Sequence, residues 1–181
     1  MMEPWKELEL AREELRRLQP AVRGELSPAA HVLGVLELGE GSVVLPGTVI
    51  DGHVRIGKGC RIGPNAYLRG ETSIGDDCVI GNAVEIKSSL LGSNVFVSHL
   101  SYVGDSIIRD DVNVGGGCIF SNFRHDAGEI RMPWRGELCL TGCNKLGCVV
   151  GSHSRIGCKC VILPGRVLPE GTWTEPGSVV R

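Results

Sequence analysis

Residues 44–86 decide the fold, and they read VLPGTVIDGHVRIGKGCRIGPNAYLRGETSIGDDCVIGNAVEI. A branched aliphatic residue recurs at every sixth position of this stretch, in a single phase: Val44, Ile50, Ile56, Ile62, Leu68, Ile74, Ile80 and Ile86. A helix repeats every 3.6 residues and a simple strand every two, so neither produces this period. A solenoid of short strands separated by turns does, because each strand then places one aliphatic side chain in the interior.

The repeat resembles the hexapeptide repeat of left-handed parallel β-helices, in which three hexads form one triangular coil. The phase slips by one residue at Leu91 and again at Ile108, which predicts coils that are one residue shorter there. After Phe120 the period lapses, and it returns at Val150. We therefore expect an all-β, left-handed parallel β-helix over residues 42–181, with a loop at about residues 122–146 that projects from the coils.

Residues 1–41 are expected to form a helix and a lead-in to the coils. The segment 4–20, PWKELELAREELRRLQP, has Pro4 in the first turn of a helix and Pro20 as its stop. One apolar stripe runs along this helix and consists of Leu8, Ala11, Leu15 and Leu18. We expect the helix to cap the open end of the β-helix or to pack against a neighbouring subunit; the alternative is a docking helix for another protein.

Composition narrows the classes of function. The chain has 181 residues and a formal net charge of −2, which indicates neither nucleic acid nor an anionic membrane as its main partner. The segment MMEPWKELEL at the start of the sequence has no apolar run that could act as a signal peptide or a membrane span, so we expect a cytoplasmic protein with reduced cysteines.

Most of the cysteines fall where the repeat places small inward-facing residues: Cys60, Cys78, Cys118, Cys148 and Cys160. Cys139, Cys143 and Cys148 lie close enough in the sequence to suggest zinc, but no paired ligand doublet completes a site. We therefore expect no metal.

Polar residues interrupt the aliphatic pattern at positions that stack from coil to coil. Arg69 and Lys87 are one full coil apart, so two cations should lie one above the other at about 4.8 Å, the spacing of adjacent strands. Stacked cations repel each other, and a phosphate over them would relieve the repulsion. Alternatively, both side chains point apart into solvent. By the same count His99 should stack on Gly116, whose missing Cβ lets a ligand approach closely.

Five segments resemble one enzyme family: GNAVEIK (81–87), SHLSYVGDSI (98–107), DVNVGGG (111–117), SNFRHD (121–126) and TGCNKLG (141–147). They are similar to the acetyltransferase half of the bifunctional glucosamine-1-phosphate acetyltransferase and N-acetylglucosamine-1-phosphate uridyltransferase, particularly to the archaeal-type sugar-1-phosphate enzymes. The resemblance implies acetyl transfer from acetyl-CoA to the 2-amino group of a hexosamine-1-phosphate, glucosamine-1-phosphate or galactosamine-1-phosphate. It also implies a homotrimer with sites shared between neighbours.

The same resemblance assigns roles to individual residues. Arg69 and Lys87 would grip the sugar phosphate, and Tyr102 and Asn113 would bind phosphate or sugar. His99 would be the general base, a task that suits imidazole near neutral pH.

The remaining assignments concern the acetyl group. Asn122 would orient the acetyl group or the amine. The backbone N–H of Gly116 would bind the acetyl carbonyl, and Ser152 would add a contact to acetyl-CoA. The phosphates of coenzyme A would meet Lys145, Arg155 or Lys159, unless these cations merely increase solubility.

The sequence also departs from the family pattern. Phe123 replaces a tyrosine of the bacterial enzymes, and Gly128 and Glu129 stand where a basic residue is expected, so Arg124 or Arg131 would have to substitute. The resemblance does not include the nucleotidyltransferase half, so uridylyl transfer is not expected.

Three other functions stay open. A different amino sugar, such as a nucleotide-linked one, could be the acceptor. A β-helical carbonic anhydrase would need three metal-binding histidines, and the five histidines here show no close pair. The chain could also be a non-catalytic oligomeric scaffold or a regulatory subunit of a separate nucleotidyltransferase.

Overall fold

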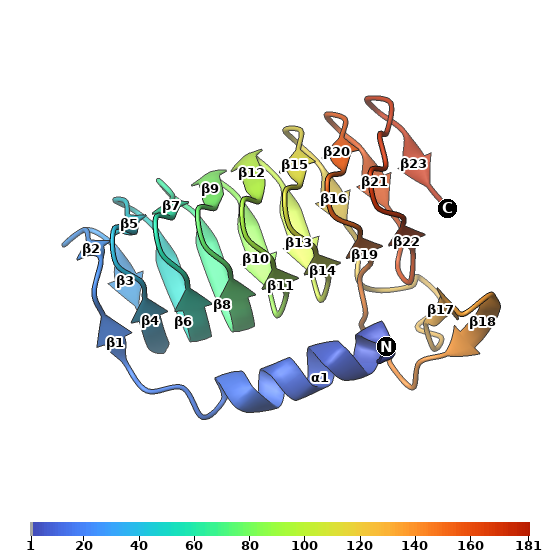
Figure 1. Cartoon of the computed structure of the whole chain (residues 1–181), viewed down its shortest axis with the longest axis horizontal. Helices are drawn as coiled ribbons and strands as arrows, with labels where there is room; N and C mark the ends of the chain where they lie inside the picture. Colours follow the sequence, from blue (N-terminus) through green and yellow to red (C-terminus); the bar gives the residue numbers. More distant parts are fainter. Residues whose placement is uncertain (1) are drawn as a thin grey trace.

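The computed structural model describes residues 2–181 and shows the left-handed parallel β-helix that the hexads predict (Figure 1). A seven-stranded sheet forms one side of the triangular tube, and a 14-stranded sheet bends around the other two. We call these the first, second and third faces in the order in which the chain passes through them. A separate two-stranded hairpin lies in the predicted loop.

Short parallel strands build each face. The first face contains β2 (Glu25–Leu26), β5 (Val43–Val44), β7 (Arg61–Ile62), β9 (Val79–Asn82), β12 (Phe96–His99), β15 (Asn113–Val114) and β20 (Arg155–Ile156). The second face contains β3 (His31–Val32), β10 (Glu85–Lys87), β13 (Tyr102–Gly104), β16 (Ile119–Phe120), β21 (Val161–Ile162) and β23 (Val179–Val180). The third face contains β1 (Ala21–Val22), β4 (Val35–Leu38), β11 (Leu90–Leu91), β14 (Ile107–Ile108), β19 (Val149–Val150) and β22 (Val167–Leu168). Two longer strands, β6 (Val49–Ile56) and β8 (Tyr67–Ile74), turn the corner between the second and third faces.

The interior of the tube is a column of aliphatic side chains. Ile50, Ile62, Ile80 and Ile86 are all completely buried, and each pairs with the aliphatic residue of the coil above or below. Burial of one such side chain stabilises the fold by about 1.5–3 kcal/mol. The shortened coils are confirmed, because Leu91 pairs with Ile108, 17 residues further along the chain.

The coils begin earlier than the domain boundary expected at residue 42. Strand β1 already pairs with β4, and Leu26 of β2 stacks on Val44 of β5. The period of six in fact continues backwards from Val44 through Leu38, Val32 and Leu26. Residues 1–41 therefore contribute a helix and the first coil rather than a helix and a simple lead-in.

Helix α1 (Pro4–Leu15) lies along the side of the β-helix and does not cap its open end, which corrects the expected position (Figure 1). Its apolar stripe packs on the outside of the third face, where Leu8 joins a second small core with Ile107, Val149 and residues of the loop. Ion pairs fix its direction: Glu7 accepts two hydrogen bonds from Arg109, at 2.6 and 2.7 Å. The helix thus bridges several successive coils.

The predicted loop leaves the coil stack after β16 and returns before β19. It contains the antiparallel hairpin of β17 (Arg131–Trp134) and β18 (Glu137–Leu140). Met132 turns inward from the hairpin and joins the same small core as Leu8. The loop is therefore anchored on the third face beside helix α1.

The five inward cysteines are all buried, as expected, and none of the eight cysteines forms a disulfide. Within residues 2–181 no group of three or more His, Cys, Asp or Glu side chains could hold a metal ion. In the same range no helix is both long and apolar enough to cross a membrane.

Leu8 provides a test of how firmly helix α1 is attached. Leu8→Ala is expected to lower the free energy of unfolding by about 2–5 kcal/mol, because it opens a cavity in a fully packed contact. Leu10→Ala, on the solvent side of the same helix, should change it by less than about 0.5 kcal/mol. Urea unfolding measures both. Equal midpoints for the two variants would show that the helix is not docked in solution.

Candidate functional site

The predicted stacking of cations is present at the corner between the second and third faces. Arg69 of β8 and Lys87 of β10 occupy paired positions on successive coils. Each cation, however, has its own carboxylate. Arg69 contacts Glu85 at 2.7 Å, and Lys87 contacts Asp105 at 2.6 Å. Internal acidic partners thus relieve the repulsion that the sequence suggested an anion would relieve.

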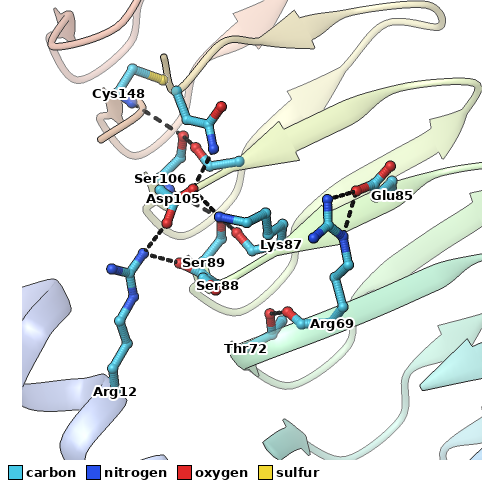
Figure 2. Close-up of polar contacts among 12 residues, drawn as sticks. Arg12, Arg69, Thr72, Glu85, Lys87, Ser88, Ser89, Asp105, Ser106 and Cys148 are labelled. Atoms are coloured by element: carbon cyan, nitrogen blue, oxygen red, sulfur yellow. Dashed lines mark hydrogen bonds and ion pairs between the residues drawn. The ribbon is translucent and has the colours of Figure 1, made fainter. Parts of the chain in front are cut away.

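Asp105 is the centre of a buried polar cluster (Figure 2). Its side chain is only 4% exposed, and it receives hydrogen bonds from Arg12 of helix α1, from Lys87 and from Asn122, which lies just after β16. We call these four residues the Asp105 cluster. Because Nδ2 of Asn122 donates to Asp105, the amide oxygen of Asn122 points the other way and is left to accept a hydrogen bond.

The backbone at Asp105 explains why this residue type occurs there. Its φ is +47°, in the left-handed region that few residues other than glycine, asparagine and aspartate tolerate. The main chain is held on both sides, because the Asp105 N–H donates to the Lys87 carbonyl and the Asp105 carbonyl accepts from Gly147, both at 2.8 Å. The corner therefore fixes the carboxylate where the loop leaves and rejoins the coils.

A cleft of about 380 Å³ opens beside this cluster. Six residues line it, and we call it the corner cleft: Arg69, Lys87, Tyr102, Asn122, Phe123 and Lys145. Four of them are residues that the sequence assigned to the site. The cleft is bounded by three cationic side chains, an aromatic hydroxyl and an amide, which is a suitable lining for a phosphorylated, hydroxyl-rich ligand.

Tyr102 lies over Gly104, and this contact depends on the missing side chain of the glycine. A Cβ added at Gly104 would lie close to the Tyr102 hydroxyl and 2.9 Å from Cγ of Asn122. Burial, reinforced by the negative charges of Asp105 and Glu85, raises the pKa of Tyr102 above its ordinary value. The phenol is therefore protonated at neutral pH and can donate a hydrogen bond.

His99 and Gly116 stack as predicted, but at a different corner, between the first and second faces. His99 pairs with Asn82 in the coil before, and its carbonyl accepts from Gly117 in the coil after. A Cβ on Gly116 would lie 3.4 Å from Cβ of His99. The His99 side chain is exposed and does not line the corner cleft.

The distance between these two parts of the site is bounded by the chain. Lys87 pairs with Gly104, which is five residues after His99, so the two Cα atoms of His99 and Gly104 are at most about 17 Å apart. Because His99 does not line the corner cleft, the two parts of the site are separate within one chain. Both parts nevertheless lie at the edges of the second face.

The other predicted residues lie away from the cleft. Asn113 is exposed on the first face, paired with Phe96 and Arg155. Ser152 is in the turn between β19 and β20, at the third corner, and its carbonyl accepts from Gly171.

Neither of the two arginines that the sequence suggests in place of the missing basic residue lines the corner cleft, but a lysine does. Arg124 is paired with Asp126, and Arg131 lines a different groove under the hairpin. Lys145 lines the corner cleft instead, because its backbone forms an antiparallel bridge with Phe123. The loop closes on itself at this point, and no periodicity in the sequence could have shown it.

Gly104→Ala tests the contact between Tyr102 and the backbone. The added methyl group would displace Tyr102 and Asn122, and a displacement of about 1 Å can lower an enzyme's activity about 10²-fold. Gly104 has no left-handed φ, so its backbone can accept alanine and the variant should fold. Gly128→Ala, at a position without a left-handed φ where an added Cβ would come no closer than 3.2 Å to a neighbouring side chain, serves as the control for activity. An unchanged rate for Gly104→Ala would exclude a role for this geometry.

Comparisons with known proteins are consistent with this architecture. Residues 44–179 match the model of the family described as GMPPB C-terminal domain. A bifunctional sugar-1-phosphate nucleotidylyltransferase/acetyltransferase of Sulfurisphaera tokodaii is 39% identical over 99 residues, which are 55% of this chain and 25% of that protein. The bifunctional protein GlmU of Methanococcus aeolicus is 30% identical over 178 residues, 98% of this chain and 43% of that protein. The chain thus spans less than half the length of these curated relatives.

One solved structure shows the same fold. It is LpxA, a UDP-N-acetylglucosamine acyltransferase from Bacteroides fragilis, which superposes with a TM-score of 0.61 at 14% sequence identity. The match covers 89% of this chain and 66% of that protein. At this identity the likeness concerns the fold alone.

Proposed function

The chain belongs to the GMPPB C-terminal domain family, and from that premise we propose that it is an acetyltransferase that moves an acetyl group from acetyl-CoA to the 2-amino group of a hexosamine-1-phosphate. The corner cleft carries the proposal, because it gathers Arg69, Lys87, Tyr102 and Asn122 in one place. The name of the relative from Sulfurisphaera, a sugar-1-phosphate nucleotidylyltransferase/acetyltransferase, agrees with sugar phosphates as the substrate class.

In this proposal the corner cleft binds the acceptor. Arg69, Lys87 and Lys145 face the sugar phosphate, for which charge-assisted hydrogen bonds are the strongest contacts available. The protonated Tyr102 donates to a sugar or phosphate oxygen. The free amide oxygen of Asn122 accepts from the substrate's amine or a hydroxyl and so orients it.

His99 and Gly116 perform the chemistry. The His99 imidazole takes a proton from the sugar's amino group while the nitrogen attacks the thioester carbonyl. The carbon–sulfur bond then breaks, and coenzyme A leaves as the thiol after it receives a proton. Among residues 2–181 no acceptor takes the backbone N–H of Gly116, so this group can donate to the oxyanion that forms at the carbonyl.

The two halves of the site meet between subunits in this proposal. In a homotrimer the His99 corner of one subunit faces the corner cleft of the next, which removes the separation within a single chain. Mixed trimers of His99→Ala and Lys87→Ala subunits should then regain about a quarter of wild-type activity, because about that share of sites has both residues intact. Absence of recovery in mixtures that form trimers would contradict a shared site.

A thiol-release screen tests the activity itself. Purified protein, acetyl-CoA and one acceptor at a time are combined, with glucosamine-1-phosphate, galactosamine-1-phosphate and nucleotide-linked amino sugars as acceptors. Release of coenzyme A only with a hexosamine-1-phosphate supports the proposal. Release only with a nucleotide-linked sugar would move the assignment to that acceptor, and no release with any of them would remove the activity.

Lys145 gives a prediction that is specific to this chain. Its side chain is exposed and makes no ion pair with any carboxylate in residues 2–181, so it is available to a phosphate. Lys145→Ala is expected to raise KM for the phosphorylated acceptor about 10-fold and to leave KM for acetyl-CoA unchanged. Steady-state kinetics separate the two constants. Lys58→Ala, an exposed lysine on an early coil, is the control; a rise in KM for acetyl-CoA instead would place Lys145 at the donor.

A non-catalytic role is the second candidate, and one observation favours it. Arg69 and Lys87 are already paired with Glu85 and Asp105, as they would be in a scaffold that never binds phosphate. A scaffold or regulatory subunit would give no thiol release alone and would change the rate of a nucleotidyltransferase with which it associates. The screen on the isolated chain distinguishes the two candidates.

A further inference from the structure

The Asp105 cluster brings together three parts of the chain that are distant in the sequence (Figure 2). Arg12 of helix α1 donates to Oδ1 of Asp105 at 2.6 Å, and Lys87 of β10 donates to Oδ2 at 2.6 Å. Asn122 shares Oδ2 with Lys87. The same Arg12 nitrogen also donates to the Ser88 carbonyl at 2.7 Å, so the guanidinium is held from two sides.

Each oxygen of Asp105 therefore has its own cation. This division matters because Lys87 also lines the corner cleft, whereas Arg12 does not. A phosphate in the cleft would compete with Oδ2 of Asp105 for the Lys87 ammonium. Whether Lys87 can turn to the phosphate depends on which other hydrogen-bond partners remain for the Asp105 carboxylate.

With Arg12 present, Asp105 remains paired after Lys87 has turned away. Arg12 still neutralises Oδ1, and the Asn122 amide still donates to Oδ2. Without Arg12, the same movement would leave a carboxylate that is 4% exposed with one neutral partner, and an unpaired buried charge is strongly unfavourable. Lys87 would then stay on Asp105.

We propose that Arg12 is a positioning residue for the acceptor: by holding Asp105, it releases Lys87 to bind the phosphate. This inference rests on the proposed function, and it gives helix α1 a role in the reaction. Arg12 is the member of the Asp105 cluster that comes from this helix. Other contacts also attach the helix, namely the packing of Leu8 and Leu15 and the ion pair of Glu7 with Arg109.

The inference predicts that Arg12→Ala weakens binding of the acceptor and that a second substitution, at Asp105, restores it. Arg12→Ala should raise the Kd for the phosphorylated acceptor about 10- to 100-fold, because Lys87 stays with the unsatisfied carboxylate. In Arg12→Ala/Asp105→Asn, no negative charge is left to retain Lys87, so the Kd should return to within about threefold of the wild-type value. A residue that only holds the helix in place would not be rescued by a change at Asp105.

The experiment measures binding to the complete protein by titration calorimetry, with glucosamine-1-phosphate and galactosamine-1-phosphate as probes. Unphosphorylated glucosamine is the control ligand, and its affinity should be the same in all variants. Arg16→Ala is the matched control variant, because Arg16 lies one turn further along the same helix and pairs with Glu71 instead. KM for acetyl-CoA should be unchanged in Arg12→Ala. Arg12→Gln removes the charge, keeps a hydrogen-bond donor and serves if the alanine variant does not fold; its Kd should rise about tenfold, and an unchanged Kd would overturn the inference in the same way.

The outcomes are distinct. Wild-type protein that binds neither sugar phosphate removes the proposed function and this inference with it. Wild-type binding with an unchanged Kd in Arg12→Ala removes this inference alone. If binding stays weak in the double variant, Arg12 has only a structural role, and this result also overturns the inference.

Discussion

His99→Ala is expected to lower turnover about 10²- to 10⁴-fold, which is the usual contribution of a general base. An amine cannot attack the thioester until it has lost its proton, and in this proposal the imidazole is the group that removes it. The side chain is exposed, so its loss should leave the fold intact. Single-turnover rates with the active acceptor measure the effect.

Two controls make the His99 result specific. His31→Ala changes a histidine on the first coil and should keep full activity. Titration calorimetry of His99→Ala should give a Kd for the acceptor within about threefold of the wild-type value, because binding belongs to the corner cleft. A His99→Ala variant with normal turnover would remove the proposed mechanism and would leave the binding site in place.

Asp105→Ala is expected to lower the free energy of unfolding by about 3–5 kcal/mol, the usual cost of removing one partner from a buried ion pair. The change leaves Arg12 and Lys87, whose side chains are 20% and 18% exposed, as two neighbouring cations without their carboxylate. It also removes the acceptor for Asn122. Urea unfolding followed by circular dichroism measures the loss.

The control for Asp105 is another aspartate on the second face. Asp51 is exposed and accepts a hydrogen bond from the Tyr67 hydroxyl, and Asp51→Ala should change the unfolding free energy by less than about 0.5 kcal/mol. If Asp105→Ala unfolds at the same urea concentration as Asp51→Ala, the carboxylate does not hold the cluster together.

The interior of the fold was predictable because it depends on a local repeat. Once three hexads complete a coil, residues 17 or 18 apart must stack, and this placed Arg69 on Lys87 and His99 on Gly116 without further information. Asp105 and Asn122, which are also 17 residues apart, contact each other in the same way. What the count could not give was the charge balance, because the partners of Asp105 include Arg12 from helix α1.

The position of helix α1 was missed for a physical reason. The repeat reports which residues face inward, whereas the helix packs on residues that face outward from the third face. Paired aliphatics occur at 90–91, 107–108 and 149–150, and in each pair one residue faces the interior and the other faces the helix or the loop. Similar pairs at 79–80, 161–162 and 167–168 have an outward residue that is partly or fully exposed, so the pairs alone did not give the position of the helix.

The helix also affects which parts of the β-helix should unfold together. In a solenoid each coil touches only its neighbours, so the ends can open while the middle stays folded. Helix α1 connects coils that do not touch each other, through Arg55 with Glu14, Arg16 with Glu71 and Arg109 with Glu7. The coils it crosses should therefore open as one cooperative unit in hydrogen exchange, whereas β22 and β23, which lie beyond the end of the helix, should exchange first (Figure 1).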